Sequence, residues 1–506
     1  MVVKLFSAGL VGVDAFPVEV EIDFARKGLP TFSLVGLAEA EVREARDRVF
    51  AAMRASDFSL PPARITVNLA PAGQRKSGTG YDLPLAIGLL AASGQIPLAA
   101  LENVFVTGEL SLTGALRPVR GVLPLAQLAR KHGATGLVVP PGNAAEAAIV
   151  QGLSVFAPAS LAETVRFFCE PGSLSPCTPL PPAHTHAPLL GYAEVKGQLA
   201  AKRALEIAAA GGHNLLMLGP PGSGKTMLAQ RLPSILPPLS FDEALEVTKI
   251  YSVAGHLPPE GGLMRERPFR APHHTVSGVA LVGGGSYPRP GEVSLAHHGV
   301  LFLDELPEYG KSVLEALRQP LEDGVVSIAR AAQSVIFPAD CMLVAAMNPC
   351  PCGYYGDSTH QCRCKPDQLA RYRARLSGPL LDRIDLHVEV PAVPYADLQG
   401  KGEGLSSAAM RERVLAARAI QEQRYAGEPI HCNAGLHGRL LDEHCALDQQ
   451  GQNIMRGATE RLGLSARAYT RVLRLGRTIA DLDGSERILA THLAEAVSLR
   501  VLDRKF

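Results

Sequence analysis

The fold of this chain is decided by the stretch Gly219-Pro220-Pro221-Gly222-Ser223-Gly224-Lys225-Thr226. An apolar run at 215–218 precedes it and predicts a strand, and the residues that follow, 227–229, can continue as a helix. A glycine loop between a strand and a helix turns backbone N–H groups toward phosphate oxygens at the positive end of the helix dipole. Lys225 can reach the β- and γ-phosphates and the Thr226 hydroxyl can bind Mg²⁺, so the stretch predicts a site for ATP and Mg²⁺.

Two further apolar runs end in residues suited to phosphate chemistry. Residues 300–303 lead into Asp304 and Glu305, and residues 342–347 lead into Asn348. Wholly apolar runs are typical of parallel strands covered on both faces, and functional residues of α/β folds follow the carboxyl ends of such strands. We therefore expect Asp304 to hold Mg²⁺ and Glu305 to deprotonate the attacking water. The Asn348 amide is placed to bond that water or the γ-phosphate, the sensor 1 role of AAA+ ATPases.

The chain is balanced in charge and has no apolar run that could span a membrane. It has 50 basic and 49 acidic residues in 506, so polyanions would be attracted by local patches only. No apolar run approaches about 18 residues, and the N-terminus lacks the plan of a signal peptide. These features predict a soluble, cytoplasmic protein with no membrane partner. The chain has no tryptophan and few other aromatic residues, and so gives no indication of extensive base stacking.

The expected architecture is α/β, and the length suits about three domains. The predicted parts are an α/β domain at 1–170, a proline-rich linker at 171–190, an ATPase core at 191–395 and a helical lid at 396–506. In the first part, alternating patterns predict strands at 18–22 and 64–69 and an amphipathic helix at 38–53. In the last part, helices are predicted at 408–425, 467–482 and 488–502, with basic residues opposite the apolar face of the last two. We expect these basic residues to form a solvated face.

The first domain contains the stretches Thr107-Gly108-Glu109-Leu110-Ser111-Leu112-Thr113-Gly114 and Arg120-Gly121-Val122-Leu123-Pro124-Leu125. They resemble the C-terminal, S5-like proteolytic domain of Lon proteases, which uses a serine–lysine dyad. The serine would fall near Thr79, but Pro124 stands where the lysine should follow. A hydroxyl without an adjacent base is a weak nucleophile. The resemblance therefore implies the fold without the protease activity, and a role in assembly or partner contacts.

The ATPase core carries two apparent insertions. Residues 280–293 contain too many glycines and prolines for a regular helix and predict a projecting hairpin or loop. Residues 325–328 and 334–337 predict two short strands around a basic tip, Ala329-Arg330-Ala331-Ala332-Gln333. A helix-2 insert before the acidic pair and a hairpin before sensor 1 are similar to those of the AAA+ clade of MCM helicases and magnesium chelatases.

Three longer motifs narrow this resemblance. They are Arg267-Pro268-Phe269-Arg270-Ala271-Pro272-His273-His274-Thr275, Gly291-Glu292-Val293-Ser294-Leu295-Ala296-His297 and Asn348-Pro349-Cys350-Pro351-Cys352-Gly353. Together they resemble the ComM/YifB family of magnesium-chelatase-like AAA+ ATPases, and the resemblance covers essentially the whole chain. It implies a DNA helicase or translocase that drives branch migration during recombination of incoming DNA in natural transformation.

The resemblance also assigns roles to four arginines. Arg383 matches the arginine finger that reaches the γ-phosphate of a neighbouring subunit, which implies a homo-oligomeric ring, most simply a hexamer; alternatively it forms a salt bridge with Asp382 or Asp385. Arg467 matches the sensor 2 arginine of the lid, with Arg471 and Arg474 as weaker alternatives. Arg330 at the hairpin tip, and secondarily Arg289, would contact DNA phosphates without base specificity; the alternative is a solvated tip.

Four of the nine cysteines lie within one short segment, at Cys350, Cys352, Cys362 and Cys364. Four thiolates can surround a tetrahedral Zn²⁺, although C-x-C is tighter than the usual C-x₂-C spacing. The alternatives are four reduced thiols, or His360 as a substitute ligand. Because this segment joins sensor 1 to the arginine-finger region, a bound zinc would be structural.

Two other functions remain open from the sequence. The first is a chelatase-type motor that remodels a protein partner for metal insertion, because its ATPase parts are the same. The second is a scaffold that binds ATP only as a switch, which Glu305 and Arg383 argue against. Arg330 and the Lon-like domain favour the DNA motor over the chelatase.

Overall fold

The computed structural model describes residues 2–26, 29–178, 190–258, 262–285, 287–330, 333–357, 360–393 and 406–500. Contacts divide the chain into two compact units. The first comprises Met1–Thr185 with Phe241–Met264, and the second His186–Ser240 with Arg265–Phe506. Most of the predicted linker, residues 179–189, lies outside the described residues. No helix in the described part of the chain is long and apolar enough to cross a bilayer.

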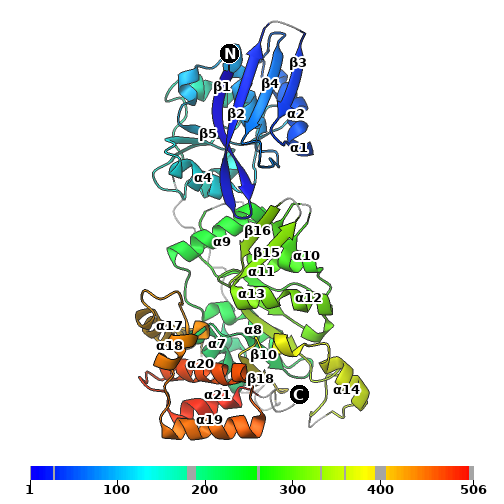
Figure 1. The fold of residues 1–506 in the computed structure, drawn as a ribbon, viewed down its shortest axis with the longest axis vertical. Helices are drawn as coiled ribbons and strands as arrows, with labels where there is room; N and C mark the ends of the chain where they lie inside the picture. The colour runs from blue at the N-terminus through cyan, green and yellow to red at the C-terminus, as the bar shows by residue number, and fades with distance from the viewer. Residues whose placement is uncertain are drawn as a thin grey trace. The chain divides into compact units, whose positions relative to one another are not determined.

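The first unit is built on a seven-stranded mixed sheet in the order β3-β4-β2-β1-β5-β8-β9. The two longest strands, β1 and β2, pair antiparallel, whereas β1, β5, β8 and β9 are parallel neighbours (Figure 1). The predicted strands at 18–22 and 64–69 are confirmed as parts of β2 and β4. The bounds are β1 Val2–Val11, β2 Asp14–Ala25, β3 Thr31–Val35, β4 Arg64–Ala70, β5 Val104–Val106, β8 Gly136–Val138 and β9 Ser154–Phe156; a separate hairpin joins β6 Glu109–Leu110 to β7 Leu116–Arg117.

The helices of the first unit pack their apolar sides against this sheet. The helix predicted at 38–53 is instead two helices, because Ala38 pairs with Lys76 in an isolated bridge and the helical pattern breaks at Glu44. The most apolar helix, α3, is buried along almost its whole length. The bounds are α1 Ala40–Arg43, α2 Ala45–Ala55, α3 Asp82–Ser93, α4 Val122–Lys131, α5 Ala144–Ala147, α6 Leu161–Cys169 and α9 Phe241–Ala254.

Helix α9 belongs to the first unit although the sequence places it between the phosphate loop and the acidic pair. Its Ser252 hydroxyl donates to Glu146 Oε2 at 2.6 Å, and the Gly121 N–H donates to the Ser252 carbonyl at 3.1 Å. Burial raises the pKa of Glu146, against the hydrogen bonds from Ser252 and Asn143. The first unit therefore consists of two separate stretches of the chain. The predicted domain boundary at residue 170 leaves out the second stretch, which contains α9.

The second unit contains a five-stranded, wholly parallel sheet in the order β11-β14-β17-β10-β18. The three strands predicted from apolar runs are confirmed with bounds close to those expected, and β17 is buried along its whole length. Parallel strands covered on both faces need such uninterrupted apolar side chains. The bounds are β10 Leu215–Leu218, β11 Phe269–Arg270, β14 Val300–Leu303, β17 Met342–Met347 and β18 Leu386–Glu389.

Helices surround this sheet, and those of the C-terminal part share its hydrophobic core. Residues of α7, α17, α20 and α21 are buried together with β10 and β18, and the orange and red helices of Figure 1 gather at this end of the unit. The bounds are α7 Leu199–Gly211, α8 Lys225–Gln230, α12 Lys311–Ala316, α13 Arg318–Asp323, α14 Pro366–Arg373, α15 Gly378–Leu381, α17 Ser407–Arg424, α18 Gly438–His444, α19 Gln449–Leu462, α20 Ala466–Leu482 and α21 Ala490–Ser498.

The expectation of a solvated basic face on α20 is wrong for its central arginines. Arg471 and Arg477 are buried, and their guanidinium groups pair with Asp385 at 3.1 Å and with Asp481 at 3.0 Å. Asp481 also accepts two hydrogen bonds from Arg424 of α17. Asp385, from the segment before β18, and Asp481, on α20 itself, thus pair with these arginines and make them part of the core.

Both predicted insertions form hairpins. The first contains α10 Gly278–Val282, the two-stranded ladder of β12 Gly283–Gly284 with β13 Arg289–Pro290, and α11 Glu292–Leu295. The second pairs β15 Val325–Arg330 with β16 Gln333–Pro338 over six residue pairs. A Cβ atom at Gly283 would lie 3.3 Å from Ile328 Cδ1, so β12 of the first hairpin lies next to β15 of the second.

Candidate active site

The phosphate loop lies between β10 and α8, as the sequence predicts. Gly222 and Gly224 have φ angles of +75° and +91°, which favour glycine, and a Cβ at either position would point into open space. A Cβ at Gly219 would instead clash with the Val390 carbonyl, so this glycine allows close packing on the end of β18. The loop therefore has an open side lined by backbone, as a triphosphate cradle requires.

Lys225 lies inside this loop and is largely buried. Its ammonium donates to the carbonyls of Gly219 at 2.8 Å and Pro220 at 2.9 Å, and to Asn348 Oδ1 at 3.2 Å. Burial lowers the pKa of Lys225, while the negative charges of Asp304 and Glu305 act in the opposite direction. The predicted lysine and the predicted sensor amide are thus brought together by β10 and β17, which are parallel neighbours.

The two predicted magnesium ligands also meet. The Thr226 hydroxyl donates to Asp304 Oδ2 at 2.7 Å, which links the first residues of α8 to the end of β14. A hydroxyl and a carboxylate that leave room for phosphate oxygens and waters are the donor set that Mg²⁺ takes at nucleotide sites. These side chains fit MgATP, with the loop N–H groups for the phosphates and Thr226 and Asp304 for the ion.

Glu305 follows Asp304 in an unusual backbone conformation, with φ at +51°. Its N–H donates to Asp304 Oδ1 at 2.9 Å, and its own carbonyl accepts from Glu308 N–H at 2.7 Å. The carboxylate is half exposed, and its Oε2 lies 3.2 Å from Nδ1 of His274. His274 belongs to the 267–275 motif, but the motif does not predict this contact; the available signal is its place shortly after β11, which neighbours β14 in the sheet.

Arg383 and Arg467 lie at the other edge of the sheet. Arg383 precedes β18, and its carbonyl accepts from Asn214, which precedes β10, at 3.0 Å. Arg467 Nη1 lies 3.9 Å from Asp382, and both arginines line a cavity of about 930 Å³. Asn214 precedes β10 and the phosphate loop with Lys225 follows it, so the length of β10 lies between the two arginines and Lys225. Neither arginine is therefore beside the phosphate loop of its own chain.

The Arg383 side chain is held within the chain without being fully satisfied. Its guanidinium donates to Glu322 and to the Pro379 carbonyl, and its Nε atom is buried without a hydrogen-bond partner. Burial lowers the pKa of Arg383, and the nearby Arg318 and Arg467 lower it further. The alternative prediction is a salt bridge from Arg383 to Asp382 or Asp385. In the structure Arg383 pairs with a different carboxylate, that of Glu322.

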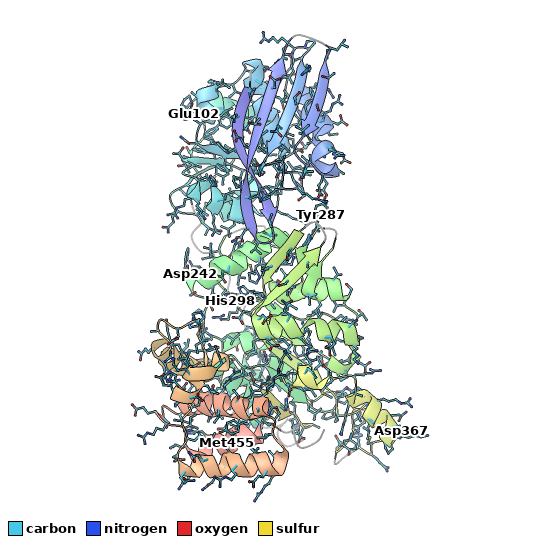
Figure 2. All side chains as sticks on the ribbon, in the orientation of Figure 1. Glu102, Asp242, Tyr287, His298, Asp367 and Met455 are labelled. Carbon is cyan, nitrogen blue, oxygen red and sulfur yellow. The ribbon has the colours of Figure 1, made fainter. Side chains whose placement is uncertain are left out.

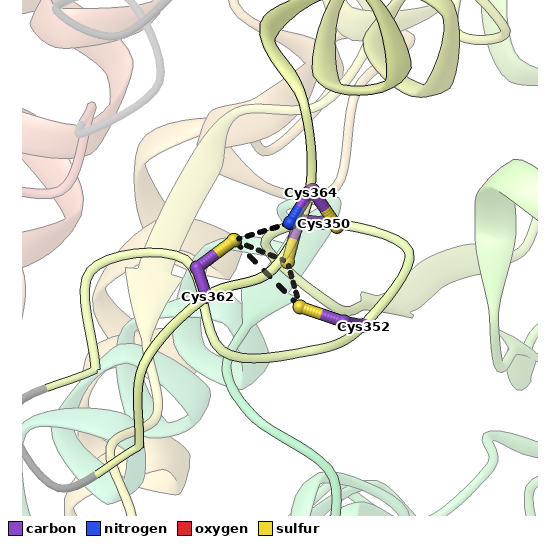
Figure 3. A group of neighbouring side chains, drawn as sticks. All are labelled: Cys350, Cys352, Cys362 and Cys364. Carbon is purple, nitrogen blue, oxygen red and sulfur yellow. Dashed lines mark hydrogen bonds between the residues drawn. The ribbon is translucent and has the colours of Figure 1, made fainter.

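The four predicted cysteines gather in one cluster (Figure 3). Their sulfur atoms all lie within 4.8 Å of one another, with 3.8 Å from Cys350 to Cys362 and 3.7 Å from Cys352 to Cys362. A tetrahedron with zinc–sulfur bonds of about 2.3 Å has edges of about 3.8 Å, so the spacing fits Zn²⁺. Backbone N–H groups of Tyr354 and Arg363 lower the pKa of Cys352 to about 6, while burial raises that of Cys350 to about 12.

This cluster packs directly on the phosphate loop. Gly353 has φ at +87°, and a Cβ at this residue would lie 2.5 Å from Pro221 Cδ. The chain from Asn348 through the C-x-C turn is therefore in contact with both the lysine and the outer face of the loop. His360, the alternative metal ligand, stacks on Tyr354 and lies 3.7 Å from Asp357.

The remaining predicted residues lie on the hairpins and in the first unit. Arg330 ends β15 opposite Gln333, while its side chain and the tip residues 331–332 lie outside the described residues. Arg289 is exposed on β13. In the first unit, the Thr79 hydroxyl donates to Glu109 at 2.5 Å, and Pro124 is buried in α4.

Family models match this chain in three consecutive parts. The model "Subunit ChlI of Mg-chelatase" matches residues 18–143, "Magnesium chelatase, subunit ChlI" matches 191–398, and "Magnesium chelatase, subunit ChlI C-terminal" matches 404–500. Together with the phosphate loop, the acidic pair and the parallel sheet, they define a magnesium-chelatase-like protein of the AAA+ class.

Full-length relatives narrow the class. The chain is 46% identical to Competence protein ComM of Haemophilus influenzae, covering 99% of this chain and 97% of that protein. It is 45% identical to YifB of Escherichia coli, covering 98% and 96%. The chain therefore belongs to the ComM/YifB family of magnesium-chelatase-like AAA+ ATPases, a family that implies ATP and Mg²⁺ as ligands.

Two partial similarities agree with the expected fold. A stretch covering 41% of the chain is 27% identical to DNA replication licensing factor Mcm6 of Drosophila melanogaster, covering 25% of that protein. A stretch covering 18% of the chain is 32% identical to Lon protease 2 of Bacillus subtilis, covering 15% of that protein.

The roles predicted for Lys225 and Glu305 can be tested separately, because one concerns ATP binding and the other ATP hydrolysis. We expect Glu305→Gln to keep ATP affinity but to lower the hydrolysis rate by about 10²- to 10⁴-fold, because the amide cannot accept the proton of the attacking water. Lys225→Ala should weaken ATP binding by about tenfold or more, because a charged hydrogen-bond donor to phosphate is lost. Fluorescent-nucleotide binding and phosphate release measure the two effects.

Glu308→Gln is the matched control. Its carboxylate pairs with Arg375 at 2.7 Å and should leave the rate within about twofold. Full hydrolysis by Glu305→Gln would contradict the assigned role.

Proposed function

We propose that this chain is an ATP-driven DNA translocase that promotes branch migration during homologous recombination of incoming DNA in natural transformation. The observation that carries the proposal is the second hairpin, β15–β16, which follows the catalytic acids along the chain and carries Arg330 at the end of its first strand. An arginine at such a tip neutralises backbone phosphates without reading bases, as a translocase requires. The relative from Haemophilus influenzae, named a competence protein, supports the biological setting.

The first hairpin supports the same role. Arg289 is exposed on β13, and Tyr287, on the turn before it, is 39% exposed (Figure 2). An arginine beside an exposed aromatic ring is suited to a single strand, since the ring can stack on any base while the cation binds the backbone. Gly283 of the first hairpin lies next to Ile328 of the second, so the two hairpins are neighbours. In this proposal both hairpins contact the DNA backbone.

The reaction assigned to the site is hydrolysis of ATP by an activated water. Glu305 accepts the proton of that water, Lys225 and the loop N–H groups hold the phosphates, and Asn348 positions the γ-phosphate or the water. Mg²⁺ on Thr226 and Asp304 supplies charge neutralisation on the phosphate oxygens.

Arg383 and Arg467 act on the nucleotide of a neighbouring subunit in this proposal. They lie at the sheet edge opposite Lys225, so an inter-subunit contact is how they reach a γ-phosphate. Arg383 would exchange its bond to Glu322 for that phosphate, and its unpaired Nε atom supplies a further donor. A head-to-tail contact of this kind closes into a ring, and a hexamer is the proposed size.

A chelatase-type motor that remodels a protein partner is the second candidate. The family models named for the magnesium chelatase subunit favour it, since they match the core and the C-terminal helices. The exposed Arg289 and the place of Arg330 at the end of β15 favour DNA, and the response to DNA distinguishes the two functions.

DNA should stimulate ATP hydrolysis, and the purified protein should convert a synthetic four-way junction into duplex products. Arg330→Ala and Arg289→Ala should each weaken DNA binding and lower the slope of log K against log salt by about one, because each removes one phosphate contact. Rates without DNA should not change. Arg439→Ala is the control, since this exposed arginine of α18 is paired with Glu443 on the same helix and with Glu428, which precedes it. A wild-type protein that neither binds DNA nor responds to it would favour the chelatase-type motor.

Two inactive variants should complement each other if Arg383 acts between subunits. Arg383→Ala should lower ATP hydrolysis by about 10³-fold or more, as expected for an arginine finger. Mixing it with Lys225→Ala should restore activity, because some interfaces then combine an intact phosphate loop with an intact finger. The mixture is assayed after joint refolding or subunit exchange. No recovery, in mixed rings that native mass spectrometry demonstrates, would contradict action in trans.

The cysteine cluster is proposed to hold one structural Zn²⁺ through Cys350, Cys352, Cys362 and Cys364. The sulfur spacing supports the site, and the ion would brace the turn that contacts Pro221.

Elemental analysis of protein purified without added metal should find about one zinc per chain. The double variant Cys352→Ser/Cys362→Ser should lose it, whereas Cys169→Ser, at an exposed cysteine far along the chain, should retain it. A metal-free protein in which all nine thiols react as free cysteines would rule out the zinc site.

A further inference from the structure

The segment that leads from Arg383 into β18 has each of its carbonyls bonded to a donor from another part of the second unit. The carbonyl of Arg383 accepts from Asn214 Nδ2 at 3.0 Å. The carbonyls of Ile384 and Asp385 accept from Arg500, a buried residue, at 3.0 and 3.1 Å. A backbone held at three successive residues has little freedom, so the groups that hold this segment set the direction of the Arg383 side chain.

Asp385 joins this segment to helix α20. Its side chain is buried, and its Oδ1 pairs with Arg471 Nε at 3.1 Å, while its Oδ2 is 3.3 Å from His213 Nδ1 and 3.4 Å from the backbone nitrogen of Asn214. Burial acts to raise the pKa of Asp385, but its hydrogen bond with His213 and the charge of Arg471 hold that pKa below its usual value. The carboxylate therefore stays charged and keeps its arginine partner.

Arg471 binds the same segment twice and lies on the helix that carries Arg467. Besides its pair with Asp385, its guanidinium donates to the Ile384 carbonyl at 3.4 Å. Arg467 is four residues earlier on α20, so the two side chains lie on one side of the helix. Both line the same cavity as Arg383. The lid helix and the arginine-finger segment are thus fastened together one helical turn from Arg467.

Exposure separates the roles of the two arginines of α20. The Arg467 side chain is 63% exposed and the Arg471 side chain 11%. An exposed guanidinium can contact a nucleotide on another chain, whereas a buried one cannot leave its carboxylate without a large cost. We infer that Arg471 is a positioning residue: through its pair with Asp385 it fixes the arginine finger relative to the lid arginine, so that both meet the neighbouring subunit's nucleotide together. The inference rests on the proposed function, in which Arg383 and Arg467 act between subunits.

A fixed spacing matters because the rate of catalysis depends steeply on geometry. A displacement of about 1 Å of a catalytic group can cost about 10²-fold in rate. The two arginines are close, since Arg467 Nη1 is 3.9 Å from the carboxylate of Asp382, the residue before Arg383. The buried pair beneath them therefore sets the distance between two groups that the proposal assigns to one nucleotide.

The first test uses Arg471→Met, which keeps an unbranched apolar stem and removes the charge. The value of kcat for ATP hydrolysis should fall about ten- to a hundredfold. KM and the affinity for a fluorescent nucleotide should stay within about twofold, because the chain's own phosphate loop is unchanged. Arg471→Lys should recover part of the lost rate, since an ammonium group can still pair with Asp385.

Arg424→Met is the matched control. The Arg424 side chain is also largely buried, at 14% exposed, and it pairs with Asp481 at 2.6 Å, so that its ion pair joins α17 to α20. This variant should lower the melting temperature about as much as Arg471→Met does and leave kcat within about twofold of wild type. An equal loss of kcat in both variants would show a general effect of stability and overturn the inference.

Mixed rings show on which side of the interface Arg471 acts. Arg471→Met subunits should gain activity when mixed with Lys225→Ala subunits, because some interfaces then combine an intact phosphate loop with an intact finger. Mixed with Arg383→Ala subunits, they should give no more than the mean activity of the two variants, since every finger is then impaired. The opposite pattern, in mixed rings that native mass spectrometry demonstrates, would assign Arg471 to its own chain's nucleotide and refute the positioning role.

If Arg471→Met does not fold, the double variant Asp385→Asn/Arg471→Met takes its place, because removing both charges of a buried pair often costs little stability. It should show the same fall in kcat, and a folded double variant with wild-type kcat would overturn the inference.

The inference and the proposed function fail in different experiments. No recovery in mixtures of Arg383→Ala with Lys225→Ala refutes action between subunits, and the inference with it. Recovery in that mixture, but none in mixtures of Arg471→Met with Lys225→Ala, refutes the role of Arg471 alone.

Discussion

The parallel register of β10 with its two neighbours is the constraint on which the rest of the second unit depends. Leu215–Leu218 runs alongside Val344–Met347 on one side and Leu386–Glu389 on the other. Parallel strands present their carboxyl ends at one edge, and so the phosphate loop, the acidic pair and the sensor asparagine converge there. A slip by one residue would turn each strand's side chains to the opposite face and separate these groups. The same register places Arg383, which precedes β18, at the other edge of the sheet.

The charged groups of the candidate site each have a partner inside the chain, although the buried Nε of Arg383 has none. Lys225 donates to loop carbonyls, Thr226 to Asp304 and Arg383 to Glu322, while Glu305 contacts His274. A buried or half-buried charge without any partner would be costly, so these internal bonds keep the site folded while it waits for substrate. Binding then replaces one set of polar contacts with another, which limits the net free energy released at each step.

Much of this arrangement could be predicted from the sequence because it is local or continuous. The phosphate loop has its own signature, and the strands of a covered parallel sheet need unbroken apolar runs such as 342–347. Contacts between distant segments could not be predicted. Periodicity identifies basic residues on α20 but cannot show that Asp385, which precedes β18, will pair with Arg471 in the core. Likewise, nothing in the spacing of His274 and Glu305 indicates a bond between them, since that depends on β11 pairing with β14.

Helix α9 follows the phosphate-loop segment in the sequence but belongs to the first unit, and the chain after it belongs to the second unit again. Its Leu245 packs against a hydrophobic cluster of that unit, and its Ser252 donates to Glu146. An expression fragment that begins after the proline-rich segment would therefore keep α9 without the residues that Leu245 packs against. It would expose apolar surface and be prone to aggregation. A soluble motor fragment would need this helix shortened or its apolar side made polar, and the first unit on its own would need the helix supplied as a separate peptide.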